Sequence, residues 1–417
     1  MRAIVSAKNF GGELPAIASK SYAHRLLICA ALSQNPSFIA CKTRSDDILA
    51  TAGCLRALGA KIEESEAGFA VTPIRETPKK ATLNCCESGS TLRFMLPIVC
   101  ALGGEYELHM EGKLPQRPLS PLYEELVAHG AVLSEQGITP LKTAGRLRGN
   151  HFKIPAGVSS QFISGLLLAL PILDGGTVEL LGKVESGSYI DITVQCLQKA
   201  GIAVTKDENT YSVAGQYKLP SQAEAEGDWS NAAFWLCAGA IGASPVTVTG
   251  LNKNSAQGDR EIVNIIKRFG ANVTQSENAV TVAPGSLVGI DVDAGDIPDL
   301  VPIISAMAAC AAGTTKIYNA ARLRLKESDR LEATADILSR LSVDITQTDD
   351  GLTIKGGEPL CGGVVDSWND HRIAMTAAVA AIAAKGSVTI ENAQSAAKSY
   401  PDFFEDFRRL GGKVTKE

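Results

Sequence analysis

The sequence has few of the residues that build metal sites. It contains five histidines among 417 residues, and none of its ten cysteines forms a Cys-x-x-Cys pair. Zinc sites need clustered ligands at short spacing, so we expect no metal. Most of the cysteines stand in apolar, alanine-rich stretches, which is typical of buried free thiols.

Long apolar runs and an excess of basic charge are also absent. No apolar run reaches the roughly 18 residues that suggest a membrane span. The first residues lack a basic stretch followed by an apolar core, so we expect no signal peptide and a cytoplasmic protein. The formal net charge of −5 argues against non-specific binding to nucleic acid, although a local basic pocket for a small anion stays open.

A signature of an apolar helix end, a small residue and a strand recurs six times. The small residues are Gly59, Gly130, Gly201, Gly270, Ser342 and Gly411, at intervals of 71, 71, 69, 72 and 69 residues. Helices often end with a residue at positive φ, which glycine adopts freely. Ser342 would therefore carry strain in that conformation. Hairpin patterns follow five of the signatures.

An apolar helix rich in small residues stands about half a unit before each signature and is expected to be buried. Each unit then consists of a buried helix, a strand, a second helix and a hairpin. Six units predict an α/β fold of two similar three-repeat domains, 14–225 and 1–13 with 226–417. The sixth unit lacks its last strand, which the N-terminal MRAIVSA is expected to supply.

Small polar or ionisable residues stand at the start of each apolar helix. With residues 20, 89, 160, 229, 298 and 370 as markers, the intervals are 69, 71, 69, 69 and 72. Helix capping alone is our interpretation for Asp228 and Ser230. Capping does not explain Lys20 or Arg372, because cations there oppose the helix dipole. A helix start that carries a cation is a site for phosphate or carboxylate.

Several motifs in chain order give the sequence a resemblance to the 5-enolpyruvylshikimate-3-phosphate (EPSP) synthases. They are SKSxxxR (19–25), SGSTLR (88–93), RP (117–118), SSQF (159–162), SxxY (186–189), GDWS (227–230), IPDLVP (297–302), LRLKESDR (323–330), NDHR (369–372) and KSYPDF (398–403). On composition alone the charged stretch 322–330 could equally be a solvated face. The family's fold, two domains of three βαβαββ-type repeats with buried helices (an inside-out α/β barrel) and a cleft between them, agrees with the repeats.

The resemblance implies transfer of enolpyruvyl from phosphoenolpyruvate to the 5-hydroxyl of shikimate 3-phosphate, with release of phosphate. It implies no cofactor, a monomer, closure of the cleft on binding, and inhibition by glyphosate at the phosphoenolpyruvate site. The residues implied for shikimate 3-phosphate are Lys20, Ser21, Arg25, Ser159, Ser160, Gln161, Ser186, Tyr189, Asp299 and Lys326. Those implied for phosphoenolpyruvate are Lys20, Gly89, Arg117, Gln161, Arg330, Arg372 and Lys398.

The reaction needs two proton movements, since the hydroxyl loses a proton and the methylene carbon C3 gains one. The candidate base for the hydroxyl is Asp299, the candidate acid at C3 is Glu327, and Lys20 is a partner for either step. The sequence departs from the family pattern at three positions whose roles are not carried over: Glu87, Ser90 and Arg322.

Two alternatives stay open. The sister enzyme that transfers enolpyruvyl to UDP-N-acetylglucosamine has Lys-Asn where this chain has Lys20-Ser21, and commonly a cysteine before its Arg-Pro, where 111–118 has none. The other alternative is a non-catalytic anion-binding protein on the same scaffold, against which the retained candidate acid and base argue.

Overall fold

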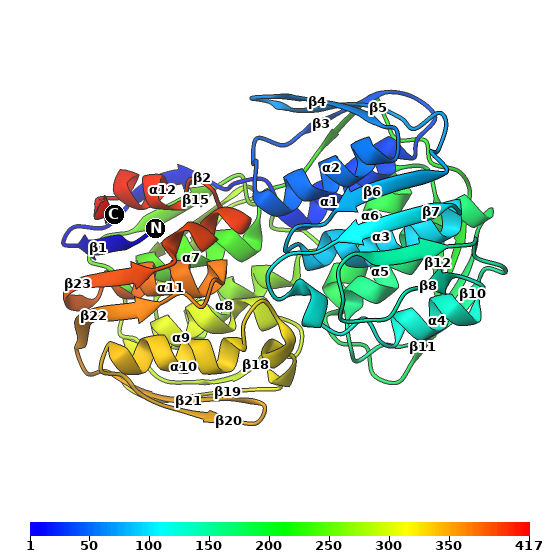
Figure 1. Cartoon of the computed structure of the whole chain (residues 1–417). Coiled ribbons are helices and arrows are strands. Elements are labelled where there is room, and N and C mark those ends of the chain that lie inside the picture. Colours follow the sequence, from blue (N-terminus) through cyan, green and yellow to red (C-terminus); the bar gives the residue numbers. More distant parts are fainter. The chain divides into compact units, whose positions relative to one another are not determined.

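The computed structural model describes all residues from 1 to 417 and divides the chain into two compact units. Unit 1 comprises Met1–Ile17 and Glu226–Glu417, and unit 2 comprises Ala18–Ala225. Six four-stranded sheets and the helices between them confirm the predicted α/β class (Figure 1). None of the helices combines the length and the apolar character that crossing a membrane would require.

Unit 2 contains three repeats of one pattern. Its inner helices are α1 (Lys20–Ala31), α3 (Gly89–Leu102) and α5 (Ser160–Ala169), and its outer helices are α2 (Asp46–Ala57), α4 (Leu122–Ala128) and α6 (Gly187–Lys199). Its first sheet has the strand order β14 (Gln222–Glu224), β3 (Ser37–Ala40), β5 (Gly68–Thr72), β4 (Lys61–Ser65). Its second sheet has the order β6 (Lys80–Asn84), β7 (Glu105–His109), β9 (Leu141–Ala144), β8 (Val132–Leu133). Its third sheet has the order β10 (His151–Pro155), β11 (Gly176–Leu181), β13 (Thr210–Ala214), β12 (Ala203–Asp207). Two 3-10 helices, η1 (Leu114–Gln116) and η2 (Leu170–Leu173), lie in its connections.

Unit 1 repeats the pattern with inner helices α7 (Trp229–Ile241), α9 (Val301–Ala309) and α11 (His371–Ala380). Its outer helices are α8 (Ile262–Phe269), α10 (Arg330–Arg340) and α12 (Phe403–Arg409), with 3-10 turns η3 (Gly258–Glu261), η4 (Pro298–Leu300), η5 (Ala321–Leu325) and η6 (Ala393–Lys398). Its first sheet has the strand order β16 (Asn272–Gln275), β17 (Ala279–Ala283), β15 (Val246–Thr249), β2 (Gly12–Pro15). Its second sheet has the order β18 (Asp291–Asp293), β19 (Gly313–Tyr318), β21 (Gly351–Gly356), β20 (Asp344–Thr348). Its third sheet has the order β22 (Leu360–Asp366), β23 (Ala384–Glu391), β1 (Ala3–Ala7), β24 (Gly412–Lys416).

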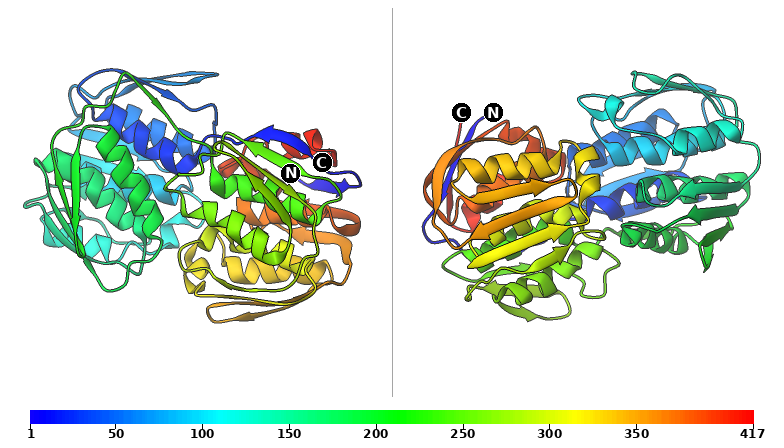
Figure 2. Two further views of the ribbon diagram at one scale, coloured as in Figure 1. Left: turned by 180° about the vertical axis from the view of Figure 1, so that it is seen from behind. Right: turned by 90° about the horizontal axis from the view of Figure 1, so that it is seen from below.

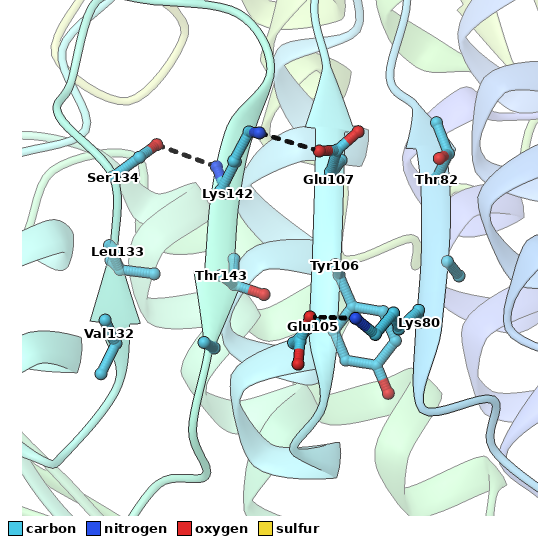
Figure 3. A pocket seen from close by; sticks show the side chains of 12 residues that line it. Lys80, Thr82, Glu105, Tyr106, Glu107, Val132, Leu133, Ser134, Lys142 and Thr143 are labelled. Atoms are coloured by element: carbon cyan, nitrogen blue, oxygen red, sulfur yellow. Dashed lines mark hydrogen bonds and ion pairs between the residues drawn. The ribbon is translucent and has the colours of Figure 1, made fainter.

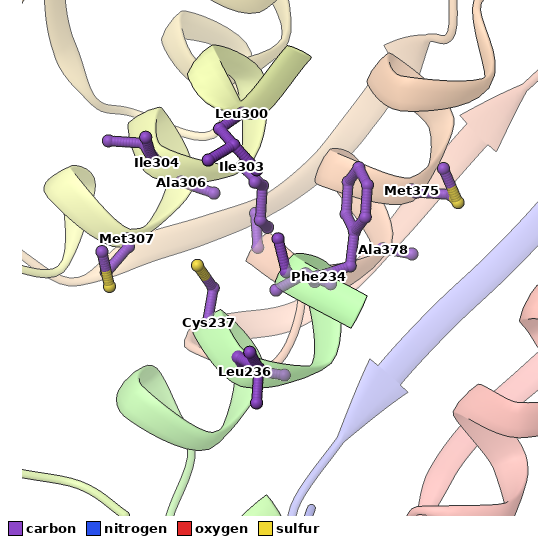
Figure 4. Close-up of a cluster of buried hydrophobic side chains, with 14 of the residues drawn as sticks. Phe234, Leu236, Cys237, Leu300, Ile303, Ile304, Ala306, Met307, Met375 and Ala378 are labelled. Carbon is purple, nitrogen blue, oxygen red and sulfur yellow. The ribbon is translucent and has the colours of Figure 1, made fainter. Parts of the chain in front are cut away.

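The inner helices of each unit are buried nearly all round, as their sequences predict. In unit 1, α7, α9 and α11 pack on one another through Phe234, Ile303, Met307 and Met375, all at most 1% exposed (Figure 4). Small residues between them let the helix backbones approach closely. Figure 2 shows the sheets of each unit lying outside its inner helices. Burial of this apolar surface is the main stabilising contribution to each unit.

The chain passes twice between the units, and just before each passage a short strand pairs with a sheet of the unit that the chain is leaving. Strand β2 precedes α1 in the sequence but pairs in parallel with β15 of unit 1, and β14 precedes α7 but pairs in parallel with β3 of unit 2. Unit 1 therefore includes residues 1–17 rather than the expected 1–13. Strand β1 lies between β23 and β24, antiparallel to both, where the sixth hairpin lacks a strand.

All six small residues at the helix ends have positive φ, as the repeat predicts. Five are glycines with φ between 77° and 103°, and Ser342 has φ of 70°. A side chain in this left-handed region costs about 1–2 kcal/mol, and glycine avoids that cost. Ser342 is exposed, so no packing compensates for its strain.

We expect Ser342→Gly to stabilise unit 1 by about 1 kcal/mol, because it relieves this strain without removing a buried contact. Thermal unfolding should show a rise of about 2–4 °C in the transition of unit 1. The matched control is Ser339→Gly, an exposed position inside α10, which should lower stability by about 0.5 kcal/mol. Destabilisation by both changes would contradict the argument.

Candidate functional site

The six inner segments begin where the polar markers predict. The helices or their leading 3-10 turns start at Lys20, Gly89, Ser160, Trp229, Pro298 and His371. Backbone N–H groups are exposed at such starts, and side chains around them can bind anions together with those groups.

In unit 2, Lys20 at the start of α1 forms an ion pair with Asp47 of α2, with 2.7 Å between Nζ and Oδ2. The backbone carbonyl of Asp47 accepts a hydrogen bond from Thr91 Oγ1 at the start of α3. Thr51 and Thr91 join α2 to α3 by a further hydroxyl hydrogen bond of 2.7 Å. The start of α2 thus holds the starts of α1 and α3 in fixed positions.

Arg25 connects three helices through neutral acceptors. Its Nε donates to Thr193 Oγ1 at 2.6 Å, and its Nη2 donates to Ser164 Oγ and to the Tyr189 carbonyl. Its Nη1 donates to the Ser21 carbonyl at 2.7 Å. Burial lowers the pKa of Arg25 to about 10, which leaves it charged at neutral pH. Most of its N–H groups therefore serve the protein's own packing.

Gly89 lies against two guanidinium groups. A Cβ added at Gly89 would stand 2.6 Å from Arg117 Nη1 and 2.8 Å from Arg93 Nη1. Arg93 also donates to Gln161 Oε1 at 2.8 Å, and Gln161 Nε2 donates to Ser90 Oγ at 2.9 Å. The starts of α3 and α5 therefore share one polar cluster in which guanidinium groups stand beside the first residues of the helices.

The remaining candidates of unit 2 lie at the starts of α5 and α6. Ser159 caps α5, because its hydroxyl accepts a hydrogen bond from the Gln161 amide, and Ser160 is the first residue of that helix. Ser186 is buried at the start of α6 with φ of 53°, a left-handed conformation that a serine rarely adopts. Strained residues of this kind gather at functional sites. Tyr189 follows in the first turn of α6.

In unit 1, the guanidinium of Arg330 is buried among three carboxylates. Its Nε lies 2.8 Å from Asp370 Oδ2, its Nη1 2.8 Å from Asp299 Oδ1, and its Nη2 2.6 Å from Glu327 Oε2. Burial alone would lower the pKa of Arg330, but Asp370, Glu327 and Asp299 raise it well above its ordinary value. The arrangement joins η4, α10 and the start of α11.

Asp299 collects further cations. Arg372 Nη2 lies 3.2 Å from Asp299 Oδ2, its Nη1 donates to the Asp299 carbonyl at 3.0 Å, and Lys326 Nζ lies 3.7 Å from Asp299 Oδ1. Arg372 also donates to Ser230 Oγ at 2.7 Å. The candidate base, the candidate acid and three cations of the predicted set are therefore in one cluster.

The structure also places the outlying residues. Lys398 Nζ donates to the Asn369 carbonyl at 2.6 Å, beside the start of α11. Arg322, one of the three positions that depart from the family pattern, donates to the Gly295 carbonyl at 2.6 Å. Glu87 lies against Gly112, so its side chain fills the space where a Cβ would stand.

Sequence reasoning missed or misjudged three side chains. Asp47 reads as an ordinary acidic first-turn residue, but it pairs with Lys20. Arg93 is a cation in a helix first turn, a signal that could have added it to the candidates. The capping prediction is confirmed for Asp228, whose Oδ1 accepts from the Asn231 amide at 2.8 Å. For Ser230 it is wrong, because that hydroxyl binds Arg372.

A hollow of about 850 Å³ lies away from these clusters, on the outer face of the sheet formed by β6, β7, β9 and β8. Figure 3 shows that its floor carries two ion pairs, Lys80 with Glu105 and Lys142 with Glu107. Its charges pair with each other across neighbouring strands, which is ordinary sheet stabilisation. No group of three or more His, Cys, Asp or Glu side chains is arranged so that it could hold a metal ion.

Comparison with known proteins connects this geometry to a family. Residues 5–407 match the family model described as EPSP synthase (3-phosphoshikimate 1-carboxyvinyltransferase). The 3-phosphoshikimate 1-carboxyvinyltransferase of Clostridium kluyveri is 41% identical over 410 residues, covering 97% of this chain and 96% of the relative. That of Clostridium perfringens strain 13 is 38% identical over 423 residues, covering 100% of both.

Solved structures agree. EPSP synthase from Acinetobacter baumannii is 26% identical with a TM-score of 0.82 and covers 100% of both chains. The enolpyruvyl transferase NikO from Streptomyces tendae, 18% identical with a TM-score of 0.79 over 99% of this chain and 98% of its own, supports the fold. On the match over nearly the whole chain and the full-length relatives, this protein belongs to the EPSP synthase family.

Proposed function

We propose that the helix-start residues described above carry out the family's reaction in this chain. That reaction transfers the enolpyruvyl group of phosphoenolpyruvate to the 5-hydroxyl of shikimate 3-phosphate and releases phosphate. The observation that carries the proposal is the cluster in which Asp299 and Glu327 share Arg330. A carboxylate pair held by a buried cation suits proton transfer next to an anion.

Unit 1 is proposed to bind phosphoenolpyruvate through Arg330, Arg372 and Lys398. The two guanidiniums are suited to bidentate contact with a carboxylate or phosphate. Both now contact Asp299, so an incoming anion competes with that carboxylate for their N–H groups. Asp299 is then released to accept the proton of the attacking hydroxyl, and Lys326 keeps a cation close to it.

Unit 2 is proposed to supply the remaining contacts to both substrates. Lys20, Gly89, Arg117 and Gln161 would bind phosphoenolpyruvate, with the open backbone at Gly89 allowing close approach of its phosphate. Those proposed for shikimate 3-phosphate are Lys20, Ser21, Arg25, Ser159, Ser160, Gln161, Ser186 and Tyr189 in this unit, with Asp299 and Lys326 of unit 1. The Tyr189 ring is proposed to lean on the substrate ring.

The proposed chemistry proceeds in two steps. In the first, the 5-hydroxyl loses its proton to Asp299 and its oxygen bonds to C2 of phosphoenolpyruvate, while C3 gains a proton from Glu327, which enters this step as the acid. In the second, C3 of the tetrahedral intermediate returns a proton to Glu327 and the C2–oxygen bond to phosphate breaks. The leaving phosphate takes the proton held by Asp299. Lys20 and the arginines stabilise the charge that develops on the phosphate.

Phosphate release from phosphoenolpyruvate and shikimate 3-phosphate tests this assignment directly. We expect turnover with that pair and none when UDP-N-acetylglucosamine replaces shikimate 3-phosphate. Turnover with the UDP-sugar alone would overturn the proposal. We also propose that the active species is a monomer and that it is cytoplasmic. Light scattering at assay concentration measures its mass and so tests whether it is a monomer.

Asp299→Asn should lower kcat by about 100-fold or more, because the amide cannot accept the hydroxyl proton. KM for phosphoenolpyruvate should change by no more than about threefold, since the amide keeps the shape of the side chain. Steady-state kinetics measures both constants. The matched control is Asp296→Asn, an exposed aspartate three residues earlier, which should leave both unchanged. Equal losses in kcat and in 1/KM would mean that Asp299 only positions the arginines.

Gly89→Ala should raise KM for phosphoenolpyruvate by about tenfold, because a misfit of 1–2 kcal/mol weakens binding by that factor. The added methyl group would stand within 3 Å of Arg117 and Arg93 and displace them. Glyphosate should compete with phosphoenolpyruvate in the unmodified enzyme and inhibit the variant much less. Gly53→Ala, an exposed helix position with nothing within 4 Å, is the control and should leave kinetics unchanged.

A further inference from the structure

Asp259 is a buried carboxylate that the proposed reaction does not use. It lies in η3, between β15 and α8, and is only 4% exposed. Its Oδ1 is buried without any hydrogen-bond partner. Buried carboxylates are ordinarily paired or fully hydrogen-bonded, because burying the charge is costly. A carboxylate left in this state calls for an explanation beyond packing.

A short series of polar groups connects Asp259 to the candidate active site. The turn η3 packs on the start of α7, because Gln257 Oε1 accepts a hydrogen bond from the Trp229 amide and Gln257 Nε2 donates to the Gly227 carbonyl. The Asp259 carboxylate therefore lies near the Ser230 hydroxyl. Arg372 Nη2 donates to Ser230 Oγ at 2.7 Å, so the hydroxyl hydrogen of Ser230 is available to donate to Asp259. Arg372 in turn contacts Asp299. One hydroxyl group therefore separates Asp259 from a guanidinium proposed to bind phosphoenolpyruvate.

The charges that face Asp259 come from three elements. They are Asp228 at the start of α7, Asp299 in η4 and Arg372 in α11. On α8, the charged side chains are in the last turn. Burial first, and then Asp299, raise the pKa of Asp259 to about 7, although Arg372 and the Ser230 hydrogen bond oppose the rise. The free protein thus holds Asp259 close to balance between its two forms.

We propose that Asp259 is a positioning residue that directs Ser230 and Arg372, and that it becomes protonated when phosphoenolpyruvate binds. An anion that arrives at Arg372 adds negative charge close to a buried carboxylate, and like charge disfavours the ionised form. By linkage, an ionised Asp259 weakens binding of that anion by the same factor. The inference rests on the proposed role of Arg372.

The KM for phosphoenolpyruvate is expected to depend on pH through Asp259. Below pH 7 Asp259 is mostly neutral, so binding of phosphoenolpyruvate needs no proton uptake by Asp259. In this range Asp259 causes no change of KM with pH. Above pH 7 each bound anion must bring a proton to Asp259, so KM rises with pH by up to tenfold per unit. The rise ends at the higher pKa that Asp259 has in the complex.

The test is KM for phosphoenolpyruvate between pH 6 and 9 at saturating shikimate 3-phosphate. In the unmodified enzyme we expect KM to rise at least fivefold from pH 6.5 to 8.5. In Asp259→Asn it should stay within twofold of the value that the unmodified enzyme has at low pH, because the neutral amide mimics the protonated acid. Glu261→Gln is the control on the same 3-10 turn, since Glu261 is exposed and binds Asn264, and should keep the unmodified profile.

Ser230→Ala separates this proposal from a purely structural role. Loss of the hydroxyl removes a hydrogen bond that favours ionised Asp259, so the rise in KM should move to higher pH. This variant also decides the question if Asp259→Asn does not fold. A KM profile of Asp259→Asn that rises like that of the unmodified enzyme, or a shift of Ser230→Ala to lower pH, would overturn the inference.

The failure of the broader proposal looks different. Absence of phosphate release from shikimate 3-phosphate and phosphoenolpyruvate at every pH would overturn the proposed function and this inference together. Normal turnover with a KM that does not change with pH in the unmodified enzyme would overturn only the role of Asp259.

Discussion

The buried guanidinium of Arg330 is the interaction on which the candidate site of unit 1 depends. A charge this deep in the protein persists only because Asp370, Asp299 and Glu327 surround it. Asp370 is itself fully buried and accepts a hydrogen bond from the Arg372 amide at the start of α11. Removing one partner of a buried ion pair typically costs about 3–5 kcal/mol. The reacting groups are therefore held by the same bonds that stabilise the unit.

The buried arginines Arg330 of unit 1 and Arg25 of unit 2 are held in different ways. In unit 1, the carboxylates neutralise the arginines before any substrate arrives, so a bound anion must displace protein groups. In unit 2, Arg25 is held by hydroxyls and carbonyls, with no carboxylate among the acceptors described above. Neutral acceptors leave its positive charge uncompensated, which favours an anionic ligand nearby. Both ways of holding an arginine are consistent with substrates that carry several negative charges.

The repeats predicted much of the fold, and the helix starts predicted much of the site. Both succeed because local chemistry decides them: small polar residues begin helices, and a residue with positive φ ends them. Even the exception at Ser342 adopts the conformation that its place in the repeat requires. The predicted fold class and family are confirmed by the sheets and by the relatives.

The contacts that sequence reasoning missed are those set by packing between distant segments. Ser230 and Arg372 are 142 residues apart, and Lys20 and Asp47 are 27 apart. No local pattern marks such pairs, because each residue has an ordinary explanation in its own helix. The pairing of β2 with β15 and of β14 with β3 was not predicted for the same reason, because it depends on contacts between segments distant in the sequence.

The position of β1 has a consequence for the order in which the chain folds during synthesis. The strand formed by residues 3–7 pairs with β23 and β24, the last of which ends at Lys416. Strand β1 therefore has no partner until β23 and β24 have been synthesised. Unit 2 is continuous in the sequence and can fold while unit 1 is still being made. Until then β1 is an unpaired strand, and exposed strands of this kind make a partly folded chain prone to aggregation.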